Sequence, residues 1–159
     1  MDSAEIRAAL EDKSGFSALY REMGRPIYIV IYRTVHSKEM AEDLMQELFV
    51  RLYAQPPSSS VKNLRAYIFR MARNLAIDAL RKERTQEHEE PVVWTDHDQR
   101  LDIERAMAKL PIAHCQAVTL HINAGFGFAQ IAQILGVSLP TAWRYYRAGL
   151  DRLREMLEE

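Results

Sequence analysis

Apolar residues recur at helical spacing in the first third of the chain. Across residues 39–54 they come in adjacent pairs every four residues, as one face of an amphipathic helix requires. Ser37 stands where an N-cap residue is favoured, and Pro56 and Pro57 cannot continue a helix. The pattern predicts a helix over residues 39–54, followed by a loop over residues 55–60.

A second segment, from about Asn63 to Arg84, divides into an apolar face and a basic face. This division predicts a long helix with one side in a core and the other side available to a partner. The apolar face carries Leu64, Tyr67, Ile68, Met71, Leu75 and Ala79, and the other face carries mostly Arg70, Arg73, Asn74, Ile77, Arg81 and Arg84.

Two shorter patterns precede these helices. Phe16–Met23 and Ile27–Val35 predict helical pieces with a break or kink near Gly24 and Pro26. Residues 1–84 together predict a helical domain of a size that folds alone.

The second part of the chain begins after a change in character. Residues 85–100 lose the periodicity, contain a proline and many acids, and predict a flexible linker. Periodicity resumes at Leu101, and Pro111 suits the first turn of a helix that reaches about Asn123. The predicted fold class is therefore all-α, with two small helical domains, residues 1–84 and 101–159, joined by a flexible acidic linker.

The segment from Phe128 to Leu150 predicts a helix-turn-helix. Gly136 can adopt the left-handed conformation that ends a first helix, and Ser138 can cap a second. The N-terminal half of that second helix is the part that enters a DNA major groove. A helical hairpin that only packs a core would show the same short pattern. The candidate DNA contacts are Ser138, Thr141, Arg144, Tyr145 and Arg147.

Charge is strongly segregated, although the net charge is only −1. Residues 62–84 carry seven Lys and Arg against two acids, whereas residues 87–104 carry seven acids against one Arg. The first stretch suits phosphates and the second would repel them.

Composition restricts the cellular compartment that we expect and the kinds of metal or catalytic site that the chain can form. Cys115 is the one cysteine, which excludes an internal disulfide and a four-cysteine zinc site, and it favours a reducing compartment. No signal peptide and no apolar run long enough to span a bilayer is present, so we expect a cytoplasmic protein. His114, Cys115 and His121 lack the convergent spacing of metal ligands. No catalytic motif is present, so we expect no enzymatic activity, cofactor, metal or small-molecule substrate.

Three motifs follow one another along nearly the whole chain. They are AEDLMQELFVRLY (residues 41–53), LRAYIFRMARNLAIDALRKER (residues 64–84) and the stretch from Leu101 to Leu157. In this order and spacing they resemble the extracytoplasmic-function (ECF) sigma factors of the sigma-70 family. The ARNLAIDALR run, and a recognition helix that lacks the commoner T-V-K-S-R pattern, are also similar to the iron-siderophore-uptake (FecI-like) branch of that family.

The resemblance implies an alternative sigma factor that directs RNA polymerase to a small set of promoters. The helix over residues 39–54 would dock on the beta-prime clamp helices of the polymerase core, and the second domain would meet the beta flap and the minus-thirty-five element. A membrane-associated anti-sigma factor is the further partner implied. The implied core-binding residues are Asp43, Gln46, Glu47 and Arg51.

The resemblance also implies that the basic helix and the loop before it contact and melt the minus-ten element. The loop from Gln55 to Asn63 would hold a flipped base. We expect Tyr67 to lie in the core and Phe69 to be the better candidate for base stacking. The implied minus-ten contacts are Ser59, Ser60, Lys62, Phe69, Arg70, Arg73, Asn74 and Arg81.

The recognition helix departs from the family pattern. Trp143 and Tyr145 stand where Lys and Arg are common, and Ala148 and Gly149 interrupt its basic end. Either aromatic packing replaces phosphate contacts, or Trp143 and Tyr146 are core residues.

Other functions and roles stay open at this point. A dimeric helix-turn-helix regulator would bind palindromic DNA alone, and a sigma-like adaptor would bind polymerase without initiating. The acidic linker would be either an occupant of a polymerase channel or a plain tether.

Overall fold

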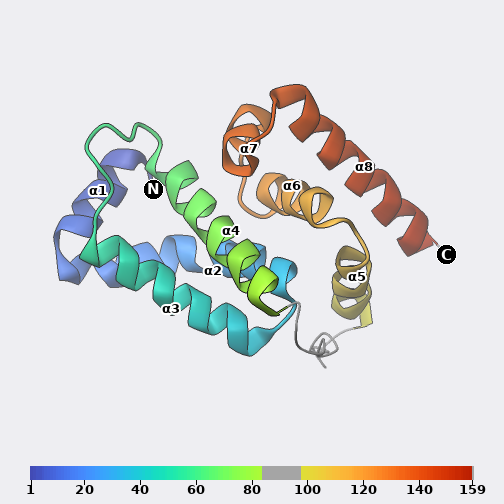
Figure 1. Cartoon of the computed structure of the whole chain (residues 1–159), viewed down its shortest axis with the longest axis horizontal. Helices are drawn as coiled ribbons and strands as arrows, with labels where there is room; N and C mark the ends of the chain where they lie inside the picture. Colours follow the sequence, from blue (N-terminus) through green and yellow to red (C-terminus); the bar gives the residue numbers. More distant parts are fainter. Residues whose placement is uncertain (84–97, 159) are drawn as a thin grey trace.

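The computed structural model describes residues 1–83 and 98–158, and its regular elements over those ranges are helices, with no strand among them. Figure 1 shows α1 to α4 as one half of the molecule and α5 to α8 as the other. The expected all-α fold class is confirmed. The helices are α1 (Ser3–Glu11), α2 (Phe16–Val35), α3 (Lys38–Ala54), α4 (Leu64–Glu83), α5 (Asp98–Ala108), α6 (Ile112–Ile122), α7 (Phe128–Leu135) and α8 (Leu139–Glu158).

Side-chain caps fix where the two predicted long helices begin. The Ser37 side chain accepts a hydrogen bond from the Met40 amide (3.2 Å) and starts α3. The Asn63 side chain accepts one from the Ala66 amide (3.0 Å) and starts α4. Each cap satisfies an amide that the helix itself leaves without a partner. Both helices lie within one residue of their predicted bounds.

The predicted break in the second helix is wrong. α2 runs without interruption from Phe16 to Val35 with Pro26 inside it. A proline inside a helix costs about 3 kcal/mol, because it removes a backbone hydrogen bond and crowds the preceding turn. Burial of apolar side chains on both sides of Pro26, among them Met23 and Ile27, offsets this cost.

Helix α1 lacks a long apolar pattern and is not predicted. Asp2 caps it by accepting from the Glu5 amide (2.8 Å), and Ile6 and Leu10 anchor it in the core. Nine residues are too few for a helix that is stable by itself, so α1 exists through this packing.

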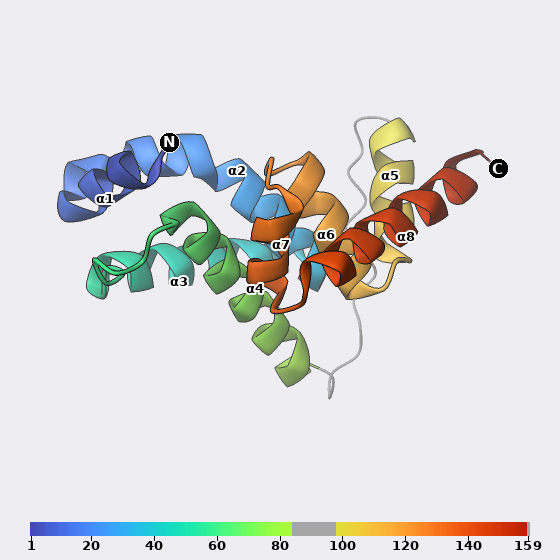
Figure 2. The ribbon, with the colours of Figure 1, turned by 90° about the horizontal axis from the view of Figure 1, so that it is seen from above.

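Among the described residues, the larger of two apolar clusters runs through both halves of the molecule. A smaller cluster, which includes Met107, Cys115 and Leu153, lies within the second half. α6 and α7 lie against α2 and α4 (Figure 2), and buried residues from α2, α3, α4, α6 and α7 form one cluster. Of the predicted linker, residues 85–97 lie outside the described residues, and Asp98–Arg100 already belong to α5.

The helix-turn-helix is confirmed in its local geometry. α7 ends at Gly136, which has the left-handed φ of 70° that glycine adopts without strain. The Val137 amide donates back to the Ala132 carbonyl (3.0 Å), and the Ser138 hydroxyl accepts from the Thr141 amide (3.3 Å). These bonds end one helix and start the next within three residues.

Gly149 is required by packing where α8 crosses α6. It is buried, and a β-carbon added there would lie 2.8 Å from a methyl carbon of Val118 and 3.2 Å from the His114 carbonyl oxygen. The glycine that interrupts the basic end of α8 therefore allows this close helix contact.

We expect Gly149→Ala to lower the melting temperature by about 2–4 °C. Overpacking costs about 1–3 kcal/mol, which exceeds the gain of up to about 1 kcal/mol in helix propensity. Gly24→Ala, inside α2, is the matched control, since its added β-carbon makes ordinary contact with the Tyr20 ring at 3.5 Å. The control should raise the melting temperature, and equal shifts in the two variants would contradict the packing role of Gly149.

Candidate nucleic-acid interface

The four predicted core-binding residues share the exposed side of α3. Asp43, Gln46, Glu47 and Arg51 are all exposed, and Arg51 and Glu47 form an ion pair (2.6 Å). Beside them lies an aromatic groove of about 640 Å³ between α2 and α3. An exposed polar row beside an apolar groove is the usual composition of a protein-binding surface. Its lining includes Phe16, Tyr20, Tyr28, Gln46, Phe49, Val50 and Tyr53.

The loop between α3 and α4 is held in shape from α1. The Arg7 guanidinium donates to the backbone carbonyls of Pro57 (3.3 Å), Ser58 (3.3 Å) and Val61 (3.2 Å). The Ser3 hydroxyl donates to the Lys62 carbonyl (3.0 Å). Among the predicted contacts, Ser59, Ser60 and Lys62 are exposed on this braced loop.

The expectation for the two aromatic residues of α4 is wrong. Phe69 is fully buried, edge-on against Phe126 with the ring centroids 4.9 Å apart, whereas Tyr67 is 36% exposed. The reason is tertiary: the side of α4 that would be free in an isolated first domain is covered by the second half of the chain. Phe69 cannot stack on a base in this arrangement, and Tyr67 is the ring that solvent reaches.

Two predicted phosphate-binding arginines also meet the second half. Arg70 donates to the Gln133 carbonyl (3.0 Å), and Arg73 donates to the Gln116 side chain (3.4 Å). Desolvation, together with the neighbouring Arg70 and Arg81, lowers the pKa of Arg73. Asn74 and Arg81 are exposed, although Asn74 accepts a bond from Arg73 (3.2 Å). The basic face of α4 is thus partly used for intramolecular contacts.

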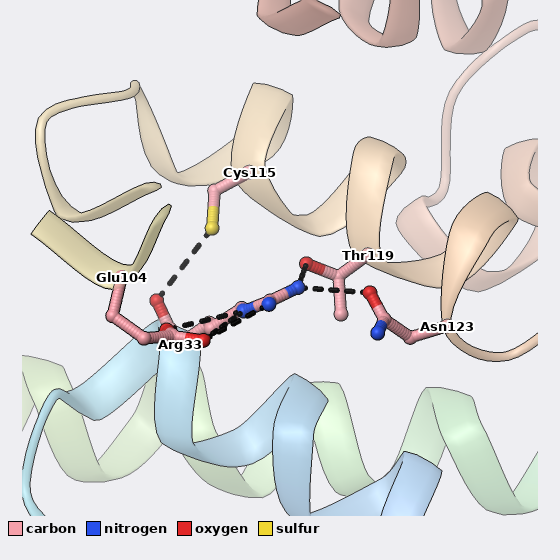
Figure 3. Close-up of polar contacts among 5 residues, drawn as sticks. All are labelled: Arg33, Glu104, Cys115, Thr119 and Asn123. Atoms are coloured by element: carbon pink, nitrogen blue, oxygen red, sulfur yellow. Dashed lines mark hydrogen bonds and ion pairs between the residues drawn. The ribbon is translucent and has the colours of Figure 1, made fainter. Parts of the chain in front are cut away.

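Arg33 is the centre of the contact between the halves (Figure 3). Its guanidinium forms an ion pair with Glu104 of α5 (3.0 Å), with two further hydrogen bonds of 3.3 Å from its Nε. It also donates to the Thr119 hydroxyl (3.2 Å) and the Asn123 side-chain oxygen (2.8 Å). The Arg33 side chain is only 11% exposed, so these charge-assisted bonds form largely away from water.

Further polar contacts surround Arg33. Gln116 of α6 is buried and donates to the Thr34 hydroxyl (3.1 Å), and that hydroxyl donates to the Val30 carbonyl (2.9 Å). On α4, Arg65 donates to the Ala124 carbonyl and lies over the Phe126 ring. These buried polar groups fix the halves in one register, because misalignment would leave them without partners.

The histidines and the cysteine of α6 serve packing. Cys115 is buried, its thiol donates weakly to the Arg33 carbonyl (3.8 Å), and burial raises its pKa to about 11. His121 stacks on Phe128, while His114 faces Tyr145. Within the described ranges, no three His, Cys, Asp or Glu side chains are grouped as metal ligands.

The recognition helix exposes most of its predicted contacts. The Arg144 guanidinium donates to the Thr141 hydroxyl (3.0 Å), which also accepts from the Ser138 hydroxyl (2.8 Å). Arg147 is exposed and lies 3.5 Å from Asp151, whereas Tyr145 is half-buried against His114.

The two readings of the aromatic residues divide between Trp143 and Tyr146. Tyr146 is half-buried and packs against His121 and Phe128 at the edge of the core. Trp143 is 48% exposed, so it is not a core residue.

Sequence reasoning missed the residues that work across long sequence separations. Arg7, Arg33, Arg65 and Phe126 have partners that are 50 or more positions away, so no local pattern identifies these contacts. One signal was present, since Arg33 interrupts the otherwise apolar end of α2.

Two family models match the chain in order. The model for sigma-70 region 2 covers residues 19–86, and the model for sigma-70 region 4 covers residues 100–153. Together they span most of the chain and coincide with its two halves.

Curated relatives of the chain are described as ECF RNA polymerase sigma factors. The chain is 28% identical to the ECF RNA polymerase sigma factor SigL of Mycobacterium tuberculosis, with 96% of this chain and 94% of that protein covered. It is 29% identical to the ECF sigma factor SigE of Mycolicibacterium smegmatis, where 87% of this chain spans 60% of the relative.

Solved structures show the same fold. The sigma factor RpoE of Bartonella quintana, in complex with the anti-sigma factor NepR, matches with a TM-score of 0.75 at 21% identity, over 90% of this chain and 96% of that one. CnrH, in complex with the cytosolic domain of CnrY, matches with a TM-score of 0.71 at 18% identity, over 97% and 94%. Among the described helices, none has the length and apolar character needed to cross a bilayer.

We expect Arg33→Ala to lower the free energy of unfolding by about 2–3 kcal/mol. The change leaves Glu104, Thr119 and Asn123 without their shared donor, and the site is only partly open to water. Arg152→Ala is the control, because Arg152 forms an exposed pair with Glu155 (3.1 Å) and its loss should stay within about 0.5 kcal/mol. Urea unfolding measures both, and equal losses would show that Arg33 contributes no more than a surface charge.

Proposed function

The chain belongs to the ECF group of the sigma-70 family, and from this we propose that it binds the core of bacterial RNA polymerase and directs initiation at a limited set of promoters. The observation that carries the proposal is the ordered pair of sigma-70 regions over both halves. The family is one of non-enzymatic transcription initiation factors.

Core binding is assigned to α3 and the aromatic groove beside it. The proposed partner is the pair of beta-prime clamp helices, contacted through Asp43, Gln46, Glu47 and Arg51. The exposure of all four residues and the neighbouring 640 Å³ groove support this assignment.

A second polymerase contact is assigned to a groove formed mainly by the other half. A groove of about 440 Å³ lies between α5, α6 and α8, and its apolar lining suits the beta flap. The lining includes Ile103, Met107, Val118, Ile122, Leu150, Leu153 and Leu157.

Promoter recognition is divided between the halves. The loop from Gln55 to Asn63 and the basic face of α4 are proposed to hold the minus-ten element, with Tyr67 in the stacking role first given to Phe69. The start of α8 is proposed to read the minus-thirty-five element through Ser138, Thr141, Arg144, Tyr145 and Arg147.

This division requires the two halves to separate. Phe69, Arg70 and Arg73 are engaged by the second half, so DNA reaches that part of α4 only after α6 and α7 move away. We assign the closed arrangement to the resting protein and an open one to the polymerase-bound protein.

We also propose how the chain is regulated and where it acts. The sigma factor RpoE, which shares the fold, is bound to the anti-sigma factor NepR, and we propose such a partner for this chain, acting in the cytoplasm. A membrane association of that partner and an iron-siderophore regulon remain predictions from the sequence resemblance.

We expect the purified chain to be retained by immobilised core polymerase and to make it initiate at a cognate promoter. Glu47→Lys should weaken retention at least tenfold, because it reverses a charge in the assigned surface, whereas Glu155→Lys on α8 should not. Tight binding of the free chain to palindromic DNA, with no retention on core, would instead indicate a conventional dimeric regulator. Retention without initiation would indicate an adaptor.

We expect variants that weaken the closed arrangement to bind single-stranded DNA more tightly. Arg33→Ala and Gln116→Ala lie on opposite sides of the contact and should each lower the apparent Kd for single-stranded DNA, by up to about thirtyfold, because a larger fraction of the chain exposes the basic face of α4. Arg152→Ala should leave this Kd unchanged. Weaker or unchanged DNA binding in both contact variants, with helical content retained by circular dichroism, would contradict the required opening.

A further inference from the structure

Two large apolar side chains stand in solvent at the start of the recognition helix. Leu139 is 51% exposed and Trp143 is 48% exposed, and they are four residues apart in the first two turns of α8. Residues at this spacing are neighbours on one side of a helix. We call Leu139 and Trp143 the apolar pair.

The closed packing leaves this apolar pair uncovered. Phe69 and Phe126 meet in the core, and Tyr146 is half-buried against His121 and Phe128. Within the described residues, no hydrogen bond or ring contact holds the Trp143 side chain. The packing between the halves therefore does not account for the exposure of Leu139 and Trp143.

The charges around the pair favour DNA as its partner. Arg144 directly follows Trp143, and Arg147 lies one turn further along the same helix. Both arginines are exposed, and the nearest acid on the helix, Asp151, lies beyond them. An apolar spot among arginines at the N-terminal end of a recognition helix suits a major groove, where phosphates flank the base edges.

The chemistry of the groove then selects the base. Guanine, cytosine and adenine present hydrogen-bonding atoms in the major groove, whereas thymine adds a 5-methyl group, the one apolar group among them. Leucine and the indole ring of tryptophan can bury such a methyl but have little with which to discriminate the other base edges.

We propose that Leu139 and Trp143 read one or two thymines in the upstream promoter element by contact with their 5-methyl groups. The inference rests on the proposed function, because it presumes that α8 enters the major groove. It also gives the departure from the common Lys and Arg pattern a role in specificity.

The test uses polymerase core loaded with the full chain. A duplex library randomised across the upstream element is selected for binding, and the selected duplex is remade with deoxyuridine in place of each thymidine in turn. Deoxyuridine lacks the 5-methyl group and keeps the hydrogen-bonding pattern. With the wild-type chain we expect a loss of about fourfold in affinity per contacted methyl, at one or two positions.

Variants connect that loss to the two side chains. Trp143→Ala should bind the thymidine duplex more weakly and should no longer distinguish deoxyuridine at one of those positions, whereas Trp143→Phe should retain most of the discrimination. Glu155→Ala is the control, since Glu155 is exposed near the other end of α8, forms an ion pair with Arg152 (3.1 Å), and lines neither assigned groove. Helical content and core binding, measured for each variant, confirm that it remains folded.

The outcomes separate this inference from the function beneath it. Failure of the loaded polymerase to form or to select any duplex would overturn the proposed function. Selection of a duplex that tolerates deoxyuridine everywhere, or whose deoxyuridine losses persist unchanged in both Trp143→Ala and Leu139→Ala, would overturn the methyl-reading role alone.

Discussion

The arrangement of this molecule depends on one partly buried cation. Arg33 projects from the end of α2 into the other half, where a carboxylate, a hydroxyl and an amide oxygen converge on its guanidinium. A buried guanidinium without partners would be strongly unfavourable, so its position defines how α5 and α6 sit against α2. The apolar contacts between Phe69, Phe126 and their neighbours add affinity, but they are less directional than these polar contacts. Burial supplies much of the attraction, and Arg33 supplies the register.

The contact between the halves explains why local patterns predicted the helices but not which of their side chains the other half covers. Caps, prolines and periodicity act over a few residues, so α3, α4, α7 and α8 could be predicted, and Ser37, Asn63 and Ser138 cap their helices in the structure. Phe69 was misassigned because its position off the apolar stripe of α4 is correct for an isolated domain. The ring that packs against it, Phe126, lies more than 50 residues away in the loop between α6 and α7. The continuous α2 has the same kind of cause, since buried neighbours outweigh the local effect of Pro26.

In the candidate site, too, the local features could be predicted and the tertiary contacts could not. The exposed polar row of α3 and the start of α8 could be read from sequence, because amphipathic spacing and helix-turn-helix chemistry are local properties. The two competing uses of α4, phosphate binding and packing against the second half, could not be predicted from the sequence. Its arginines suit phosphates by composition, yet Arg70 and Arg73 bind a carbonyl and an amide of the same chain. A surface of this kind has two sets of partners, and the sequence alone does not say which set is engaged.

The hydrogen bonds that Ser3 and Arg7 of α1 donate to the loop between α3 and α4 have a thermodynamic consequence for that loop. A free loop that closes around a ligand loses conformational entropy on binding, at about 1–2 kcal/mol for each backbone residue that becomes fixed. Here Arg7 and Ser3 already hold the carbonyls of Pro57, Ser58, Val61 and Lys62. That loss therefore occurs during folding, before any ligand arrives. In the proposed role, α1 strengthens the grip on an opened DNA strand without touching it, by presenting a preorganised loop.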